Sequence, residues 1–291
     1  MGRIIGVLLL AGLVGGCASI KLAYNQAPEL MYLYIDRYFD FDSEQKPLVK
    51  TELTQLQAWH RKTQLPVYIE TLQKLQPRMT ADYSATQACE IVTEVRVKMR
   101  AVASHIEPGA ARLALQFDND QFAQMEKKFA RDNAKFRNEY LDATPAQMRK
   151  KRVKDATNRA EKLYGQLEKR QLEVLFKTIA DSRFDAKVAY TERLRRQAMM
   201  LQTLRGLVDL PQRDDPAAQQ HAVAAVAALM QQPFVSADPD YRRYVQAQTQ
   251  ESCQAFADLH NSTTPEQRQH GVKTLKQYEE DFRALANPTS G

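Results

Sequence analysis

The chain has 291 residues, and its 41 Lys and Arg against 35 Asp and Glu give a formal net charge of +6. A chain of this length can bury a core without many disulfides, which excludes a small scaffold held together mainly by cysteines. Glycine is sparse, with 10 residues, and Lys, Glu, Gln, Ala, Leu and Arg dominate. This composition favours helices.

The first sixteen residues have the pattern of a bacterial lipoprotein export signal. Arg3 provides a positive start, an apolar segment follows over 4–14, and two glycines precede Cys17. The apolar segment is shorter than the roughly 20 residues that a membrane-spanning helix needs. The stretch resembles a lipobox, which predicts that 1–16 are a cleaved signal peptide and that Cys17 is acylated. An ordinary signal peptide with a chance cysteine is the alternative.

Acylation of Cys17 would attach the protein to membrane lipid on the periplasmic face of the cell envelope. Ala18, and not Asp, follows the cysteine, which in lipoproteins that this chain resembles favours the outer membrane over the inner membrane. Residues 17–25 are then expected as a lipidated tether. Eight extended residues after the cysteine reach at most about 28 Å, so the folded body is expected close to the membrane.

The rest of the chain is predicted to be all-α, an elongated bundle of about eight to ten helices without a substantial sheet. Apolar residues recur at helical spacing almost everywhere. Residues 28–39 are apolar around most of the circumference and are predicted as a buried helix. Pro66 is expected to kink a long helix that starts at Ser43, and Pro108-Gly109 to end the next one. Further helices are predicted over 122–140, 145–164, 168–181, 185–208, 217–231, 239–260 and 265–286.

The polar segment from Pro211 to Pro216 is interpreted as a linker. It divides the chain into a main helical domain, 26–210, and a C-terminal helical subdomain, 211–291, which is expected to pack on the main body.

A short repeat marks several predicted helix starts. A residue able to cap a helix is followed three positions later by glutamine, which is the pattern of a capping box. Proline at the first helical position of two copies fits the same interpretation. The five copies begin at Asp42, Ser84, Asp118, Thr144 and Thr264, and a degraded sixth copy spans 167–171.

The cysteines other than Cys17 form an even pair, Cys89 and Cys253. If the protein is exported, it reaches an oxidising compartment where Cys89 and Cys253 can form a disulfide. The two cysteines are 164 residues apart. A disulfide that closes a loop of this length would stabilise the fold by an amount on the order of 5 kcal/mol before strain is subtracted. Two buried free thiols are the alternative, because both cysteines lie beside apolar helical positions.

Positive charge is concentrated in the middle third, where residues 111–205 hold 22 Lys and Arg against 13 Asp and Glu. Lys187, Arg193, Arg195 and Arg196 lie on one predicted helix and form a candidate anion-binding face. For an exported protein, an anionic envelope component or an envelope protein is a better partner than nucleic acid. A solvated basic face, paired with acidic C-terminal helices, is the alternative.

No strong catalytic signature is present. The histidines form no His-Glu-x-x-His pattern, and the chain has no Cys-x-x-Cys pair, Gly-rich phosphate loop or Gly-x-Ser-x-Gly turn. We therefore predict a protein that is not an enzyme, without catalytic, cofactor-binding or metal-binding residues. A hydrolase of envelope polymers stays open, because a missing motif does not exclude chemistry.

Several segments resemble an uncharacterised family of proteobacterial lipoproteins of unknown function. They include 20–25, 32–40, the Trp59-His60-Arg61 region and 192–197. The resemblance implies a helical fold and an envelope location, without an assigned activity. The cap-x-x-Gln repeat is also similar, more weakly, to the Leu-Thr-x-x-Gln motif of the Spy/CpxP-type periplasmic chaperones, although leucine never precedes the cap here.

The sequence thus predicts an outer-membrane-anchored periplasmic lipoprotein that binds a partner or has a structural role. The alternative is a chaperone-like holdase for envelope proteins, which would need an exposed apolar concave surface.

Overall fold

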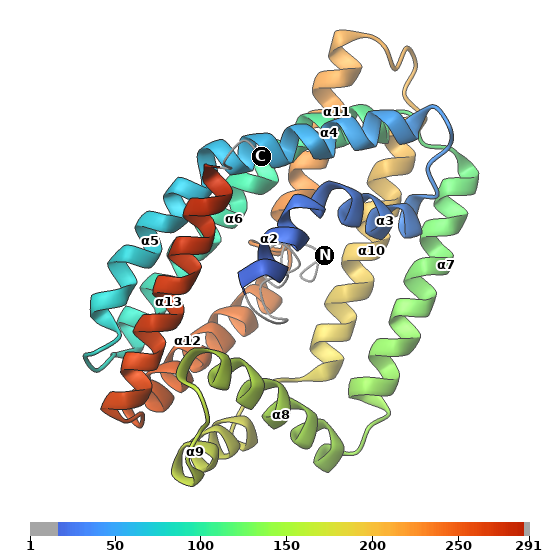
Figure 1. The fold of residues 1–291 in the computed structure, drawn as a ribbon. Helices are drawn as coiled ribbons and strands as arrows, with labels where there is room; N and C mark the ends of the chain where they lie inside the picture. The colour runs from blue at the N-terminus through green and yellow to red at the C-terminus, as the bar shows by residue number, and fades with distance from the viewer. Residues whose placement is uncertain (1–16, 288–291) are drawn as a thin grey trace.

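The computed structural model describes residues 17–287, and every regular element in this range is a helix (Figure 1). Eleven continuous helices occur there when the π-helical turns are joined to the α-helices they extend. The all-α prediction is confirmed, with slightly more helices than expected. The elements are α2 (Cys17–Asn25), α3 (Ala27–Phe39), α4 (Gln45–Trp59), η1 (His60–Gln64), α5 (Leu65–Arg78), α6 (Ala85–Ala114), α7 (Asn119–Phe136), η2 (Arg137–Leu141), α8 (Pro145–Tyr164), α9 (Lys169–Ala180), α10 (Ala186–Val208), α11 (Pro216–Gln231), α12 (Pro239–Asn261) and α13 (Pro265–Ala286).

The predicted capping boxes start the helices. Four copies have both halves of the box. The side chain of the cap residue accepts a hydrogen bond from the backbone N–H of the glutamine, and the glutamine side chain accepts one from the backbone N–H of the cap residue. Asp42 and Gln45 make the same two bonds just before α4, at 2.7 and 3.3 Å. In the degraded copy, Gln171 accepts from the Glu168 amide at 2.8 Å. The four complete boxes lie at Ser84, Asp118, Thr144 and Thr264.

Two prolines lie inside longer helices. α6 continues through Pro108 and Gly109 to Ala114, so the predicted helix end at this position is wrong. The proline removes one backbone hydrogen bond, but α6 packs against α4, α11 and α12, and these contacts hold the helix together. The expected kink before Pro66 takes the form of the π turn η1, which is closed by the bond from the Leu65 amide to the His60 carbonyl. Such turns accommodate an interrupted helical ladder.

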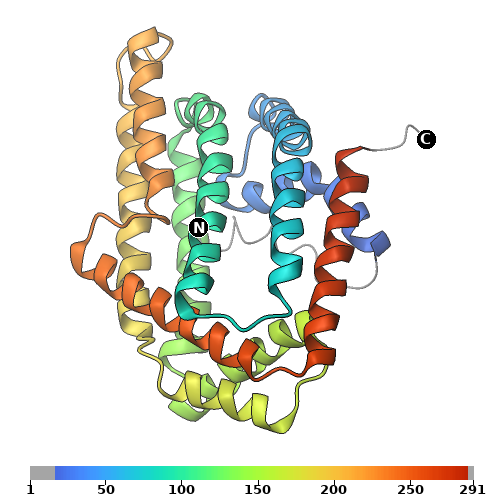
Figure 2. The same ribbon diagram turned by 90° about the vertical axis from the view of Figure 1, so that its left-hand side faces the viewer.

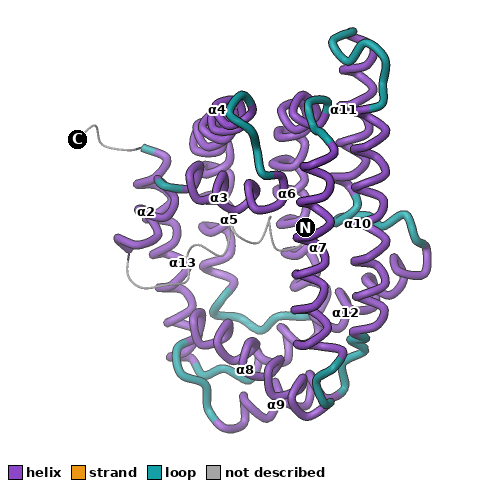
Figure 3. The backbone as a smooth tube through the Cα atoms, turned by 90° about the vertical axis from the view of Figure 1, so that its right-hand side faces the viewer, coloured by secondary structure: helices purple, strands orange, loops and turns teal. Residues whose placement is uncertain are grey.

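Most of the helices are arranged as a ring in the view of Figure 1. α5 and α13 run side by side along one edge, and α7 and α10 form the opposite one. α8 and α9 pack together and lie at the lower end of the views in Figures 2 and 3. α3 packs against both α4 and α7.

Two separate groups of buried apolar side chains hold this arrangement. The larger group, here called the upper core, joins α3, α4, α6, α7, α10 and α11 and includes Phe122, Met125 and Leu207. The smaller group, the lower core, joins the end of α5 to α8, α9 and α12 through Tyr164 and Leu259. The division leaves the middle of the molecule without a continuous core.

The predicted full burial of the helix at 28–39 is wrong. Tyr32 is buried, whereas Leu30 and Leu33 remain about half exposed. The reason is geometric, because α3 packs against α4 and α7 and its remaining face is uncovered.

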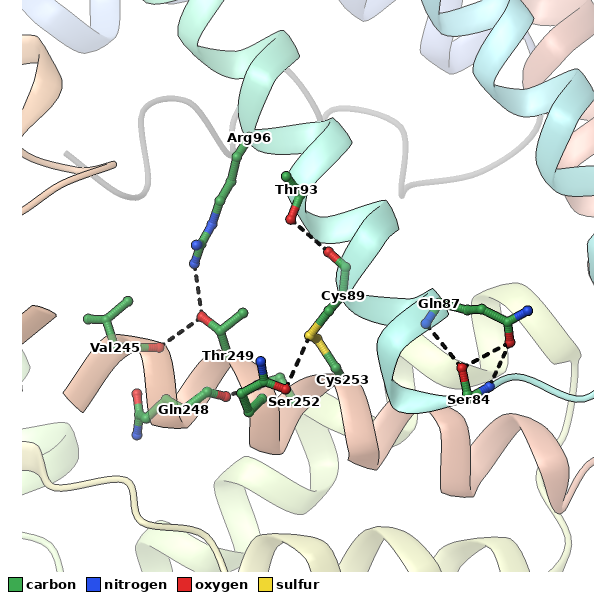
Figure 4. The surroundings of a disulfide bond; sticks show 11 residues. Ser84, Gln87, Cys89, Thr93, Arg96, Val245, Gln248, Thr249, Ser252 and Cys253 are labelled. Carbon is green, nitrogen blue, oxygen red and sulfur yellow. Dashed lines mark hydrogen bonds between the residues drawn. A yellow bond between two sulfur atoms is a disulfide. The ribbon is translucent and has the colours of Figure 1, made fainter. Parts of the chain in front are cut away.

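The C-terminal helices are distributed over the main body. α11 and α12 pack against α6, and α13 packs against α5. A disulfide joins Cys89 of α6 to Cys253 of α12, whose Cα atoms are 5.3 Å apart (Figure 4). Arg96 adds a bond from its guanidinium to Thr249 Oγ1 at 2.9 Å in the same interface. Residues 211–287 therefore close the ring of helices and are fixed to it covalently.

Candidate functional site: a central cavity

The two cores border a cavity of about 1480 Å³. Side chains from nine helices line it: α3, α4 and α6 to α12. Most small-molecule pockets have volumes of roughly 300–1,000 Å³. The volume here fits a ligand larger than a typical metabolite.

One part of the cavity wall is apolar and is formed by the upper core. Phe39, Phe117 and Phe129 belong to it, together with Leu204 and Val226. Methionine is unusually frequent in this wall, and its flexible, polarizable side chain adapts to irregular apolar shapes. The five methionines are Met31, Met125, Met199, Met200 and Met230.

A second part of the wall is charged. Lys128 pairs with Asp132 at 2.5 Å, and Tyr38 donates to Asp132 Oδ2 at 2.7 Å. Burial would raise the pKa of Asp132, but the hydrogen bonds from Lys128 and Tyr38 outweigh it, and the pKa is lowered. Burial raises the pKa of Tyr38. At neutral pH Asp132 is therefore an ionised and paired carboxylate.

Glu192 of α10 is a buried acceptor for two arginines. Arg195 and Arg196 each donate through Nε to one of its carboxylate oxygens at 2.6 Å, and Ser236 Oγ donates at 2.8 Å. Burial raises the pKa of Glu192, but the bonds from Arg195, Ser236 and Arg196 lower it further than burial raises it. One carboxylate thus pairs with two guanidinium groups, which leaves one positive charge in excess.

The four residues of the predicted anion-binding face do not share a surface. Arg193 and Arg196 line the cavity. Arg195 instead bonds Gln232 and Ser236, between α11 and α12. Lys187 is exposed and does not line the cavity. The four diverge because α10 is packed on several sides, so successive residues meet different neighbours.

Arg193 is held by neutral groups. Its Nε donates to Asn133 Oδ1 at 2.6 Å, and its guanidinium lies 6.0 Å from the Phe136 ring centroid. Among residues 17–287, no carboxylate oxygen lies within salt-bridge distance of it. The Arg196 guanidinium lies 5.5 Å from the Tyr241 ring.

Arg152 of α8 also reaches the cavity wall. It donates to Ser182 Oγ at 2.9 Å and lies 4.8 Å from the Phe184 ring. Burial lowers its pKa, while Glu251 opposes the shift. Residues 149–154, a basic cluster in the sequence, therefore contribute at least one side chain to the cavity.

Residues 17–25, expected as a tether, form α2. Nine residues at 1.5 Å per residue span about 14 Å, which is shorter than the extended estimate because a helix rises less per residue than an extended chain. α2 also packs against α13 and α3. Tyr24 Oη lies 2.9 Å from His60 Nδ1, and Arg61 donates to Asn25 Oδ1 at 2.9 Å. The signal peptide expected at 1–16 lies outside the described residues, as does the side chain of Cys17.

Burial lowers the pKa of His60 to about 4. The imidazole is therefore neutral at pH 7 and lies between α2 and α5, next to Tyr24 and Tyr68. His60 and Arg61 thus hold α2 against the body, whereas Trp59 stacks on His105 of α6, with ring centroids 3.8 Å apart.

No helix within residues 17–287 combines the length and apolar character needed to cross a bilayer. Within the same range, no three His, Cys, Asp or Glu side chains are grouped closely enough to hold a metal ion.

The comparisons with known proteins identify a family without assigning an activity. Residues 37–242 match a family described as "Family of unknown function (DUF6279)". No curated protein and no solved structure matches the chain. The matched region runs from α3 into α12, so it includes most of the cavity wall and continues past the linker at 211–216. Because it covers well over half of the chain, the protein belongs to this family of unknown function.

Proposed function

We propose that the protein is a non-enzymatic, lipid-anchored binding protein of the cell envelope, and that its central cavity holds a lipid. The observation that carries the proposal is the cavity itself, with its volume of about 1480 Å³ and its wall of phenylalanine and methionine side chains. An apolar cavity of this size stabilises a ligand by removing its hydrocarbon surface from water.

The proposed anchor is Cys17, acylated after cleavage of the leader, with transfer to the outer membrane. The lipobox-like sequence supports it, and so do exposed leucines on the two helices that follow. Leu22, Leu30 and Leu33 expose 65%, 53% and 49% of their surface. Exposed leucines on two consecutive helices can supply an apolar surface that contacts a membrane or a partner. The disulfide between Cys89 and Cys253 fits an oxidising compartment such as the periplasm.

A cavity-filling substitution tests the binding function. Ala110 lines the cavity, so Ala110→Trp occupies part of the space that the ligand needs. Ala217→Trp, at an exposed position at the start of α11, is the matched control. We expect native mass spectrometry of the protein purified from envelopes to detect bound lipid with the wild type and the control, and at least tenfold less with Ala110→Trp. Equal lipid occupancy in all three proteins would count against the cavity as the binding site.

The second candidate is a holdase for unfolded envelope proteins. The five methionines of the cavity wall favour it, because methionine-rich surfaces can adapt to many apolar partners. A holdase predicts that the wild type suppresses aggregation of a denatured outer-membrane protein and that Ala110→Trp suppresses it less. A lipid-binding protein without chaperone activity leaves aggregation unchanged.

A further inference from the structure

We infer that the ligand of the cavity is an anionic phospholipid, with its acyl chains against the upper core and its headgroup phosphate at Arg193 and Arg196. This inference rests on the proposed function, and it specifies the class of lipid and its orientation.

The chains are assigned to the upper core because the apolar wall is concentrated there. The methionines at 31, 125, 199, 200 and 230 and the rings of Phe39, Phe117 and Phe129 belong to it or pack against it. Hydrocarbon gains about 25 cal/mol for each Å² of surface removed from water. A charged headgroup placed there would lose its hydration without a compensating partner.

The phosphate is assigned to Arg193 and Arg196 because both lie on the cavity wall and are three positions apart on α10. Residues at this spacing lie on the same side of a helix. Each guanidinium is oriented through Nε, by Asn133 for Arg193 and by Glu192 for Arg196. Their terminal nitrogens make no hydrogen bond to other side chains or to the backbone within residues 17–287, so each can offer two donors to a phosphate.

Over the whole cavity lining six Lys and Arg balance six Asp and Glu, and the charges next to Glu192 leave a local excess that favours an anion. Glu192 is shared between Arg195 and Arg196, and Asp132 is already paired with Lys128. The surplus positive charge therefore stays with Arg193 and the Arg195–Arg196 pair. An anionic headgroup neutralises it, whereas a neutral lipid of the same chain length does not.

The test compares dioctanoyl phosphatidylglycerol with dioctanoylglycerol, which has the same chains and no phosphate. The full chain is titrated with each by calorimetry, as wild type and as Arg193→Gln/Arg196→Gln. The control, Lys187→Gln/Arg205→Gln, makes the same charge change on the same helix at residues that do not line the cavity. Circular dichroism melting checks that each variant is folded.

We expect the wild type to bind the phospholipid at least tenfold more tightly than the diacylglycerol. The Arg193→Gln/Arg196→Gln variant is expected to lose this preference while its affinity for diacylglycerol stays within about twofold, because charged hydrogen bonds are lost and the apolar wall is intact. The control variant keeps the preference.

Equal affinity for both lipids in the wild type, or an unchanged preference in the double variant, overturns the headgroup site and leaves the proposed function standing. Failure of both lipids to bind overturns the proposed function as well. Displacement of the phospholipid by inorganic phosphate at a similar concentration would show a site for the free anion instead of a lipid.

Discussion

Gln45 and Gln121 exchange two side-chain hydrogen bonds, at 3.2 and 2.7 Å, and so join the starts of α4 and α7. Each glutamine oxygen also accepts a bond from the amide of its own helix cap, Asp42 or Asp118. Gln45 Nε2 further donates to the Gln116 carbonyl at 3.0 Å. The repeat that marks helix starts in the sequence therefore also fastens helix starts to each other.

The same arrangement recurs at the other end of the molecule. Gln171 and Gln267 exchange bonds at 2.6 and 2.9 Å and join α9 to α13. Their amide nitrogens donate to the Ser262 and Gln166 carbonyls. Two glutamine pairs thus join helix starts, α4 to α7 and α9 to α13.

Gln121→Ala is predicted to lower the free energy of unfolding by about 2–4 kcal/mol, because it removes a cap bond and both buried hydrogen bonds to the Gln45 side chain. Gln147→Ala is the matched control, since Gln147 is exposed and, among residues 17–287, its side chain bonds Thr144 alone. We expect the control substitution to lower the free energy of unfolding by about 0.5–1 kcal/mol. Urea unfolding followed by circular dichroism measures both. Equal losses would mean that the Gln45–Gln121 pair adds nothing beyond the cap.

The disulfide is predicted to stabilise the fold strongly. Cys89→Ala or Cys253→Ala opens a loop of 164 residues and should cost up to about 5 kcal/mol of unfolding free energy through chain entropy. Both substitutions should give the same loss, and both should abolish the faster migration of the wild type in non-reducing electrophoresis. Unchanged migration in either variant would contradict the bond.

Glu279 is predicted to make stability depend on pH in acid. Hydrogen bonds from Gln76, Arg283 and Lys276 lower the pKa of this buried carboxylate to about 2 from an ordinary value of 4.5. Between these values the unfolded state binds more protons than the folded state. The stabilisation is therefore complete above pH 4.5 and is lost as the pH falls towards 2.

Thermal melts of Glu279→Gln and of Glu280→Gln, at the exposed neighbouring position, check this prediction. The first variant should be less stable at pH 7 and should show a smaller fall in melting temperature between pH 5 and pH 2. The second should follow the wild type. If the melting temperature of Glu279→Gln falls between pH 5 and pH 2 as much as that of the wild type, Glu279 is not the source of the acid dependence.

The exposed leucines of α2 and α3 are predicted to lie against the bilayer. On reconstitution of the lipidated protein into vesicles, amide hydrogen exchange in both helices should slow, and Leu22→Asn/Leu30→Asn/Leu33→Asn should reverse this. Val97→Asn/Leu172→Asn/Leu194→Asn changes exposed apolar residues on other helices and should leave the protection in place. Equal protection of α2 and α3 from hydrogen exchange in both triple variants would contradict the prediction that these leucines face the membrane.

Local signals in the sequence predicted the local structure well. The cap-x-x-Gln pattern found the starts of α6, α7, α8 and α13 because a capping box depends on residues three positions apart. The prediction that a helix ends at Pro108 was wrong, because the tertiary packing of α6 outweighs the missing hydrogen bond.

The candidate site could be predicted only in part. Arg193 and Arg196 belong to the predicted basic face of four residues, but whether they meet solvent or a cavity depends on α7, α8 and α12, which are distant in the chain. The apolar wall had no separate signal, since a residue that lines a cavity has the same helical spacing as one in a filled core. The pairing of glutamines from separate repeats was likewise beyond a local pattern.

Photo-crosslinking with a phospholipid that carries a diazirine at the end of one acyl chain tests the central claim most directly. The full chain is crosslinked in native envelopes, and the modified residues are mapped by mass spectrometry. We expect adducts on the cavity wall, at Met199, Met200, Leu204 or Met230, and their loss in Ala110→Trp. Adducts confined to Leu22, Leu30 and Leu33 would place the lipid outside the molecule and contradict a lipid-filled cavity.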